Sequence, residues 1–117
     1  WRGLVNGVIE NTIAAMQADS PLMAYLGPAI GPDAFEVGAE VREAFIAHDA
    51  AAAAAFTYIG DGKYLADIYA LARQRLQAAG VSAVYGGEYC TVLQREDFFS
   101  YRRDGQTGRM VSAIWLE

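Results

Sequence analysis

The fold is decided by residues 64–87, YLADIYALARQRLQAAGVSAVYGG, which place a helix directly before a strand. Apolar side chains recur every three or four positions, a spacing that lines one face of an α-helix from Tyr64 to about Ala79. Gly80 ends this helix, because glycine readily takes the left-handed conformation found just after a helix. The apolar run 81–87 is short and predicts a strand. The apolar positions of the helix are Leu65, Ile68, Tyr69, Ala72 and Leu76.

The first part of the chain predicts two further helices, separated by a strand and a stiff loop. Apolar residues at one-turn spacing predict a helix over Val5–Met16, and Pro21 cannot continue it. The apolar run 22–27 predicts a short buried strand. Two Gly-Pro pairs in 27–32 restrict the backbone, so this loop is expected to be rigid. A second helix is expected from about Val37 to Ala47.

The middle of the chain contains six consecutive alanines, Ala50–Ala55. Alanine has the highest intrinsic helix propensity, so this run predicts another helix, with Asp49 as its N-cap. The Gly-Asp-Gly within 57–63 predicts a turn before the next helix. Because helices and strands are mixed along the chain, the predicted class is α/β or α+β, in a single domain over residues 1–117.

The C-terminal residues predict a β-hairpin that carries three of the nine basic residues. Strands are expected at 98–103 and 109–116, joined by the glycine-rich turn DGQTG. Side chains alternate along a strand, so either Arg102 or Arg103 would share a face with Arg109. Two guanidinium groups on one face would bind a phosphate or a carboxylate. The alternative is a solvated hairpin end with surface ion pairs.

Arg2 and Gly3 stand directly before the first predicted helix. Helix N-termini offer unpaired N–H groups and the positive end of the dipole to anions, and glycine lets a ligand approach the backbone. Arg2 is therefore another candidate anion contact, and the alternative is a frayed terminus.

Other residues that can carry chemistry are better explained by the fold. His48 is the single histidine, and its place at the end of a predicted helix suits the helix dipole. Cys90 has no base beside it and is expected to be a buried structural thiol. Neither residue has partners at metal-ligand spacing, so no metal site is predicted within the chain. The carboxylates expected on solvated helix faces are Glu36, Glu40, Glu43 and Asp67.

Composition disfavours several classes of protein. The net charge of −5 argues against nucleic acid as a partner, because phosphate backbones select basic surfaces. One cysteine excludes an internal disulfide and fits a reducing cytoplasm. No apolar run approaches the ~20 residues that cross a bilayer, and no signal peptide is visible. A chain that begins at Trp1 suggests processing, trimming or a fragment.

Four segments, in order, resemble the YfiH-like family, also called the multicopper polyphenol oxidase or laccase-domain family. They are WRGLVNGVIENT, YLGPAIGPDAFEVGAEVREAF, KYLADIYALARQRL and FFSYRRDGQTGRMVSAIWL. The resemblance covers nearly the whole chain, although members of the family are much longer. It implies part of a four-layer α/β/β/α sandwich with mixed sheets, of which residues 1–117 would be the C-terminal half. A partial domain of this kind should expose sheet edges or apolar faces.

The resemblance also implies a zinc site in the intact protein, bound by two histidines and a cysteine. All three ligands are expected upstream of Trp1, and one of them belongs to a His-Ala-Gly segment directly before it. Cys90 and His48 match none of these ligands. Older descriptions of the family name copper, but the chain has no histidine-rich copper motif.

Purine nucleoside phosphorylase activity is the function that the resemblance implies, with adenosine, inosine and methylthioadenosine as substrates and adenosine deamination as a second activity. The partners would be a nucleoside, phosphate and the missing N-terminal half, without nucleic acid or membrane. Arginines suit the task of holding phosphate beside the sugar. Arg2, Arg103 and Arg109 are thus the candidates for phosphate or substrate binding, and no catalytic residue is assigned. The alternatives are a peptidoglycan-precursor editing hydrolase, a polyphenol oxidase and an inactive truncated module.

Overall fold

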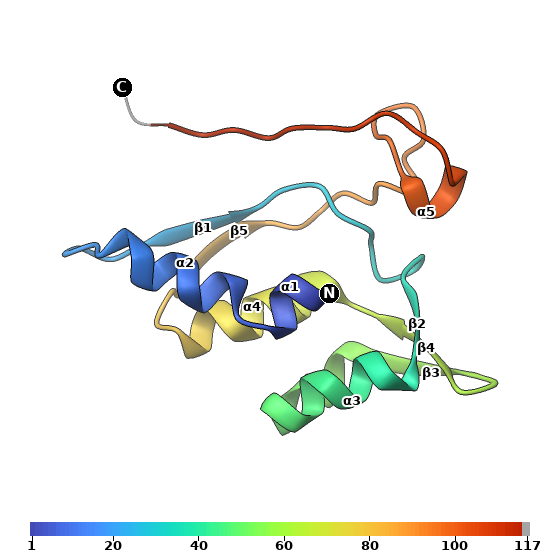
Figure 1. The fold of residues 1–117 in the computed structure, drawn as a ribbon, viewed down its shortest axis with the longest axis horizontal. Helices are drawn as coiled ribbons and strands as arrows, with labels where there is room; N and C mark the ends of the chain where they lie inside the picture. Colours follow the sequence, from blue (N-terminus) through green and yellow to red (C-terminus); the bar gives the residue numbers. More distant parts are fainter. Residues whose placement is uncertain (116–117) are drawn as a thin grey trace.

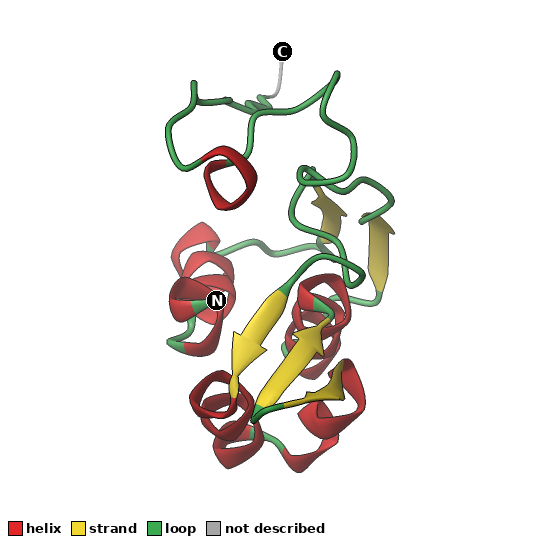
Figure 2. Cartoon of the chain, turned by 90° about the vertical axis from the view of Figure 1, so that its right-hand side faces the viewer, coloured by secondary structure: helices red, strands yellow, loops and turns green. Residues whose placement is uncertain are grey.

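The computed structural model describes residues 1–115 and combines helices with strands (Figures 1 and 2). The helices are α1 (Arg2–Val5), α2 (Val8–Met16), α3 (Ala39–His48), α4 (Ile68–Ala78) and α5 (Tyr101–Asp104), with the 3₁₀ helix η1 (Ala50–Ala55). The strands are β1 (Met23–Leu26), β2 (Glu36–Gly38), β3 (Phe56–Gly60), β4 (Lys63–Ala66) and β5 (Ala83–Gly86). This mixture confirms the predicted fold class. None of the helices in the described part of the chain is long and apolar enough to cross a membrane.

The strands form two small sheets. β1 and β5 run parallel, with Met23 opposite Ala83, and they confirm the strands predicted at 22–27 and 81–87. The first of them was predicted to be buried, which is wrong, because Met23 and Tyr25 of β1 are exposed. The other sheet is antiparallel in the order β2-β4-β3, so β4 is its central strand. Figure 1 shows the parallel pair alongside α2, and Figure 2 shows the antiparallel sheet between helices.

The hydrophobic core lies between α3, η1, α4 and the antiparallel sheet. Phe45 is its most enclosed large side chain, with 2% of its surface exposed. The Phe45 ring centre lies 6.1 Å from that of Phe56, and Phe56 meets Tyr64 edge-on. The other buried members are Phe35, Val37, Val41, Ala52, Ala55, Ala66 and Leu71. This core fixes β2 and α3 against the rest of the molecule.

The helix predicted over Val5–Met16 is divided in two at Gly7. Gly7 has a φ of +98°, a left-handed conformation that glycine adopts without a steric penalty. The helical region therefore begins earlier than predicted, at Arg2 in α1, and resumes in α2 after the break. Its predicted end at Met16 is correct.

The helices predicted over Val37–Ala47 and Tyr64–Ala79 begin later than expected. Their first residues instead form β2 and β4, which pair with each other. Pairing between these distant segments outweighs the local helical spacing, since strand formation depends on cross-strand neighbours. Asp67 then caps α4, its carboxylate accepting a hydrogen bond from the Ala70 N–H at 3.0 Å. The helix ends as predicted, before Gly80 in the left-handed region at a φ of +90°.

A hairpin occupies the segment where only a turn was predicted, 57–63. β3 and β4 pair on either side of Asp61 and Gly62. The Ala50–Ala55 run is a 3₁₀ helix rather than an α-helix, although Asp49 is its N-cap as predicted. A run of six residues is too short for alanine propensity alone to sustain an α-helix.

The C-terminal hairpin predicted at 98–103 and 109–116 is not formed. Tyr101–Asp104 is helix α5, and the Ser100 hydroxyl caps it by accepting a hydrogen bond from the Arg103 N–H at 3.2 Å. Within residues 1–115, no main-chain hydrogen bond joins the two predicted strands. The serine cap starts a helical turn where the alternation of side chains indicated a strand.

Residues 105–115 form an extended segment beside the β1–β5 pair, on the side away from α4 (Figure 1). Leu116, the last residue of the predicted second strand, lies outside the described residues. Large apolar side chains are exposed on this segment and on the parallel strands, as the resemblance led us to expect. They are Val111 (91% exposed), Ile114 (95%), Trp115 (73%), Met23 (71%), Tyr25 (66%) and Tyr85 (55%).

Candidate functional site

A polar pocket of about 440 Å³ opens beside the first residue of the chain. Its lining comes from the start of α1, the junction of β2 and α3, the first residue of β4, and α5. The lining residues are Trp1, Ala34, Glu36, Val37, Gly38, Glu40, Val41, Lys63 and Arg102. The volume is that of a small-molecule site, and the lining combines two cations, two carboxylates and an indole. Such a set suits a ligand with both negative charge and hydroxyl groups.

The two cations reach this polar pocket from different elements. Arg102 belongs to α5, and its guanidinium carbon lies 5.4 Å from the centre of the Phe35 ring. Its Nη1 donates to the Glu36 carbonyl oxygen at 2.9 Å, which fixes the side chain. Lys63 begins β4 and lies opposite Gly38 of β2. Sequence reasoning missed Lys63, because its neighbours in the chain indicate only a turn.

The carboxylates of the pocket come from β2 and α3. Glu36 and Glu40 are exposed as predicted, although Glu36 lies on a strand rather than a helix. The Glu40 carboxylate folds back over the backbone at Gly38, where the start of α3 favours negative charge. The other predicted carboxylates lie outside the pocket, with Glu43 exposed on α3 and Asp67 capping α4.

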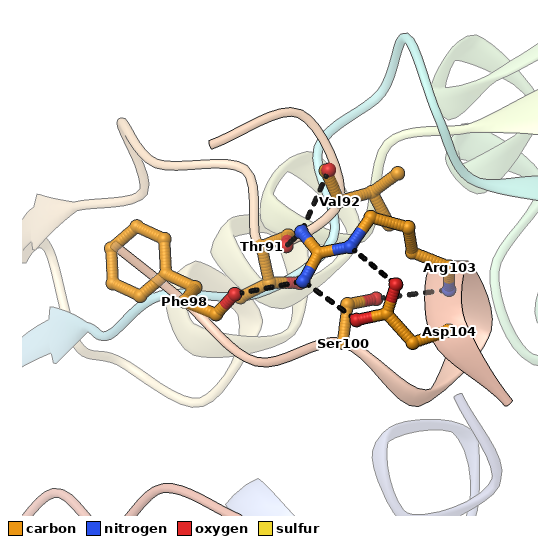
Figure 3. A network of polar contacts seen from close by, with 6 residues as sticks. All are labelled: Thr91, Val92, Phe98, Ser100, Arg103 and Asp104. Carbon is orange, nitrogen blue, oxygen red and sulfur yellow. Dashed lines mark hydrogen bonds and ion pairs between the residues drawn. The ribbon is translucent and has the colours of Figure 1, made fainter. Parts of the chain in front are cut away.

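Arg103 is the centre of a network of polar contacts (Figure 3). Its Nη1 donates to the carbonyl oxygens of Thr91 and Val92 at 3.0 and 3.1 Å, and its Nη2 to that of Phe98 at 3.0 Å. The Asp104 carboxylate accepts from Nε and Nη2 at 3.0 and 2.8 Å. This hydrogen-bonded pair raises the pKa of Arg103 and lowers the pKa of Asp104. Every guanidinium N–H is thereby used, and together they fasten the preceding loop to α5.

Arg2 and Arg109, the other two arginines predicted to bind an anion, lie in different places. The Arg2 guanidinium carbon lies 5.2 Å from the centre of the Trp1 ring, beside the polar pocket that Trp1 lines. Arg109 lines a separate hollow of about 280 Å³ together with two aromatic side chains. The prediction that Arg109 shares a strand face with Arg102 or Arg103 was wrong, because the hairpin on which it depended is not formed.

Cys90 is half-buried and hydrogen-bonded to the backbone. Its Sγ accepts from the N–H groups of Gly31 at 3.2 Å and Leu93 at 3.5 Å. Burial favours the neutral thiol, but these N–H groups outweigh it, so the pKa of Cys90 is lowered. The contacts agree with the predicted structural role. His48 is the last residue of α3, as predicted.

The hydroxyl of Tyr69 holds the loop 27–32 in place. It accepts a hydrogen bond from the Ala29 N–H at 2.7 Å and donates one to the Tyr89 carbonyl oxygen at 2.6 Å. Tyr69 is buried, and burial raises the pKa of its hydroxyl. The loop is therefore fixed by a side chain of α4 as well as by its prolines.

Replacing Tyr69 with phenylalanine should lower the free energy of unfolding by about 1–3 kcal/mol, because two part-buried backbone hydrogen bonds lose their partner. Urea denaturation of the full-length protein measures this loss. Tyr58 supplies a matched control, since its hydroxyl is exposed and accepts only one hydrogen bond of 3.3 Å, from Gly62. Tyr58→Phe should change stability by less than about 0.5 kcal/mol. Equal losses in the two variants would contradict the assignment.

A metal site does not form within the described residues. Among residues 1–115, no three His, Cys, Asp or Glu side chains come together in a way that could hold a metal ion. Cys90 and His48 therefore lack the further ligands that zinc needs. No residues in this part of the chain match the zinc ligands that the family resemblance implies.

A family profile and the curated relatives both relate this chain to one protein family. The sequence profile of the family described as multi-copper polyphenol oxidoreductase laccase matches residues 1–117. Purine nucleoside phosphorylase YfiH of Shigella flexneri is 64% identical over 118 aligned residues, covering 99% of this chain and 48% of the relative. A purine nucleoside phosphorylase of Haemophilus influenzae is 51% identical, covering 100% of this chain and 49% of the relative. The chain spans about half the length of the curated relatives it matches.

Solved structures share the fold as well as the sequence. A Neisseria meningitidis protein is 60% identical with a TM-score of 0.86, and the match covers 90% of this chain and 44% of that protein. YlmD from Geobacillus stearothermophilus is 29% identical with a TM-score of 0.78, covering 90% of this chain and 42% of that protein. The chain therefore belongs to the YfiH-like family, whose profile is that of the multi-copper polyphenol oxidoreductase laccases.

Proposed function

We propose that the whole protein is a purine nucleoside phosphorylase, with adenosine, inosine and methylthioadenosine as substrates. The observation that carries this proposal is the 64% identity, across 99% of this chain, to a relative named for that activity. Adenosine deamination, a zinc cofactor and a cytoplasmic location complete the proposal. The zinc, bound by residues outside this chain, would supply an activated water for deamination.

The polar pocket supports the proposal through its chemistry. In phosphorolysis a phosphate oxygen forms a bond to C1′ of ribose, and the base leaves with the electrons of the broken C–N bond. The site must therefore hold an anion beside a sugar. The pocket offers cations at Lys63 and Arg102 and hydroxyl acceptors at Glu36 and Glu40. Trp1 forms part of its lining, so a His-Ala-Gly segment directly before Trp1 would lie near the pocket.

The three arginines predicted from sequence have different roles in this proposal. Arg103 is a positioning residue, because its guanidinium joins α5 to the loop before it. Arg2 and Arg109 remain the candidates for a contact with ribose or phosphate in the whole protein. Arg2 is the better placed of the two, since it stacks on Trp1 at the polar pocket.

The full-length protein should convert adenosine to adenine and ribose 1-phosphate, at a rate that depends on added phosphate. Chromatography of the base and an enzymatic assay of the sugar phosphate measure both products. Residues 1–117 alone should show only the background rate, because they span about half the length of the relatives that carry this name. A rate of base release that does not depend on the phosphate concentration would contradict phosphorolysis. Full activity of the isolated segment would contradict the dependence on residues outside it.

A polyphenol oxidase is the second candidate, because the matching family profile carries that description. The same preparation, loaded with copper, can be assayed for oxygen uptake with a phenolic substrate. We expect no uptake above that of free copper. Uptake faster than nucleoside phosphorolysis would favour the oxidase.

A further inference from the structure

We propose that Lys63 and Arg102 together bind the phosphate group in the polar pocket. The ligands are inorganic phosphate as the substrate and the phosphate of the sugar phosphate as the product. The inference rests on the proposed function, and it assigns the phosphate to two residues that the sequence did not single out as a pair.

Arg102 is held in a position from which it can bind an anion. Its guanidinium stacks on the buried ring of Phe35 at 5.4 Å, and its Nη1 donates to the Glu36 carbonyl oxygen at 2.9 Å. One N–H is used in this way, and the other donors of the fork have no hydrogen-bond partner within residues 1–115. A planar group that is already oriented loses little freedom when it binds a phosphate in bidentate fashion.

Lys63 brings a second positive charge to the same pocket from the central strand of the antiparallel sheet. It is exposed at the first position of β4, so its side chain is open to solvent. Its backbone is fixed by pairing with Gly38 of β2. A fixed backbone with a mobile ammonium group suits a ligand that must enter and leave.

The charges of these two cations are not used by ion pairs. The ion pairs within residues 1–115 lie elsewhere, at Arg75 and at Arg103. Lys63 and Arg102 form none, although two carboxylates line the same pocket. Their charge is therefore available to an anion that enters. Arg103, by contrast, has every donor occupied by the protein itself.

The carboxylates determine which anion the pocket accepts. The Glu40 carboxylate is turned over the backbone at Gly38, beside the start of α3. Glu36 remains an acceptor for a sugar hydroxyl, and its charge opposes a free phosphate. We therefore expect Glu36→Gln to strengthen binding of inorganic phosphate and to weaken binding of ribose 1-phosphate.

The test uses the full-length protein and titration calorimetry, first with inorganic phosphate and then with ribose 1-phosphate. Lys63→Gln and Arg102→Ala should each weaken phosphate binding about 10- to 100-fold, as expected for a charge-assisted hydrogen bond. Lys63→Gln alters an exposed side chain, so it tests the site even if Arg102→Ala impairs folding. Arg42→Ala is the matched control, because Arg42 stacks on Tyr64 at 5.3 Å outside the pocket lining. It should leave phosphate affinity unchanged.

Two further results separate this inference from the proposed function. If Lys63→Gln binds phosphate as tightly as the unmodified protein, the inference is overturned, even if phosphorolysis is intact. If Arg109→Ala loses phosphate binding while Lys63→Gln and Arg102→Ala keep it, the inference is overturned as well. The phosphate would then belong to the separate hollow that Arg109 lines. If Lys63→Gln loses phosphate binding but the unmodified protein cleaves no nucleoside, the phosphate site is supported and the proposed function fails.

Discussion

Replacing Phe45 with alanine should lower the free energy of unfolding of the whole protein by about 3–5 kcal/mol. Phe45 lies on α3 with 2% of its surface exposed, and its ring centre lies 6.1 Å from that of Phe56. Truncation removes buried apolar area and leaves a cavity that the surrounding elements fill only in part. Because α3 forms one side of the polar pocket, Phe45→Ala should also weaken ligand binding there.

Urea denaturation followed by circular dichroism measures the effect of Phe45→Ala. Phe45→Leu keeps most of the volume and should cost less than about 1.5 kcal/mol. Ile59 of β3 provides the control, since 46% of its surface is exposed. Ile59→Ala should change the free energy of unfolding by no more than about 0.5–1 kcal/mol. A loss at Phe45 as small as that at Ile59 would contradict the position of the core.

Replacing Arg75 with methionine should cost about 2–3 kcal/mol, because it breaks a partly buried ion pair and leaves one charge behind. The Arg75 Nε donates to the Glu10 carboxylate at 2.6 Å, and side-chain exposure is 8% for Arg75 and 37% for Glu10. The guanidinium also donates to the Val5 carbonyl oxygen at 3.3 and 3.4 Å. One side chain thus joins α4 to both N-terminal helices. Water can reach Glu10 in part, which brings the expected loss below the ~3–5 kcal/mol that is typical of fully buried pairs.

The same pair should make stability depend on pH. Burial favours the neutral form of Glu10, but the hydrogen bond from Arg75 outweighs it and lowers the pKa below its ordinary value of 4.5. A depressed folded-state pKa stabilises the protein above pH 4.5, and this stabilisation is lost as the pH falls through the lower folded-state value. Glu10→Gln should therefore flatten the decline of stability in that acidic range.

Denaturation midpoints between pH 7 and 3 measure this effect. Glu43→Gln removes an exposed carboxylate from α3 and should leave the decline unchanged. Arg75→Met should flatten the decline as Glu10→Gln does, since each variant removes one member of the pair. Parallel declines in Glu10→Gln and in the unmodified protein would refute the coupling.

Local patterns in the sequence predicted the elements whose signals are themselves local. The helix before Gly80 and the strand after it follow from apolar spacing and one glycine, and both are present. β2 was missed because it is stabilised by pairing with β4, which is distant in the chain, and β4 was missed because its residues continue the apolar spacing of the helix that follows. The C-terminal hairpin was wrong because Ser100 caps a helical turn, a signal carried by one hydroxyl within an otherwise strand-like run.

The candidate site was predicted less completely than the fold. Arg2, Arg103 and Arg109 were chosen because arginine binds anions, but the sequence does not say which guanidinium groups the protein itself uses. Arg103 is fully engaged by backbone carbonyls and by its neighbour Asp104. The polar pocket, by contrast, joins Lys63 to α1 and α5, an association that only the folded chain brings about.

The parallel pairing of β1 with β5 has a consequence for folding. These strands enclose residues 27–82, so their pairing closes a long segment of the chain. Closing so long a segment costs entropy that the local β3–β4 hairpin does not incur. The pair should therefore form late, and the rings of Tyr25 and Tyr85 that it carries remain exposed after it has formed. During synthesis, while β1 waits for its partner strand, this unpaired edge is open to aggregation and to capture by a chaperone.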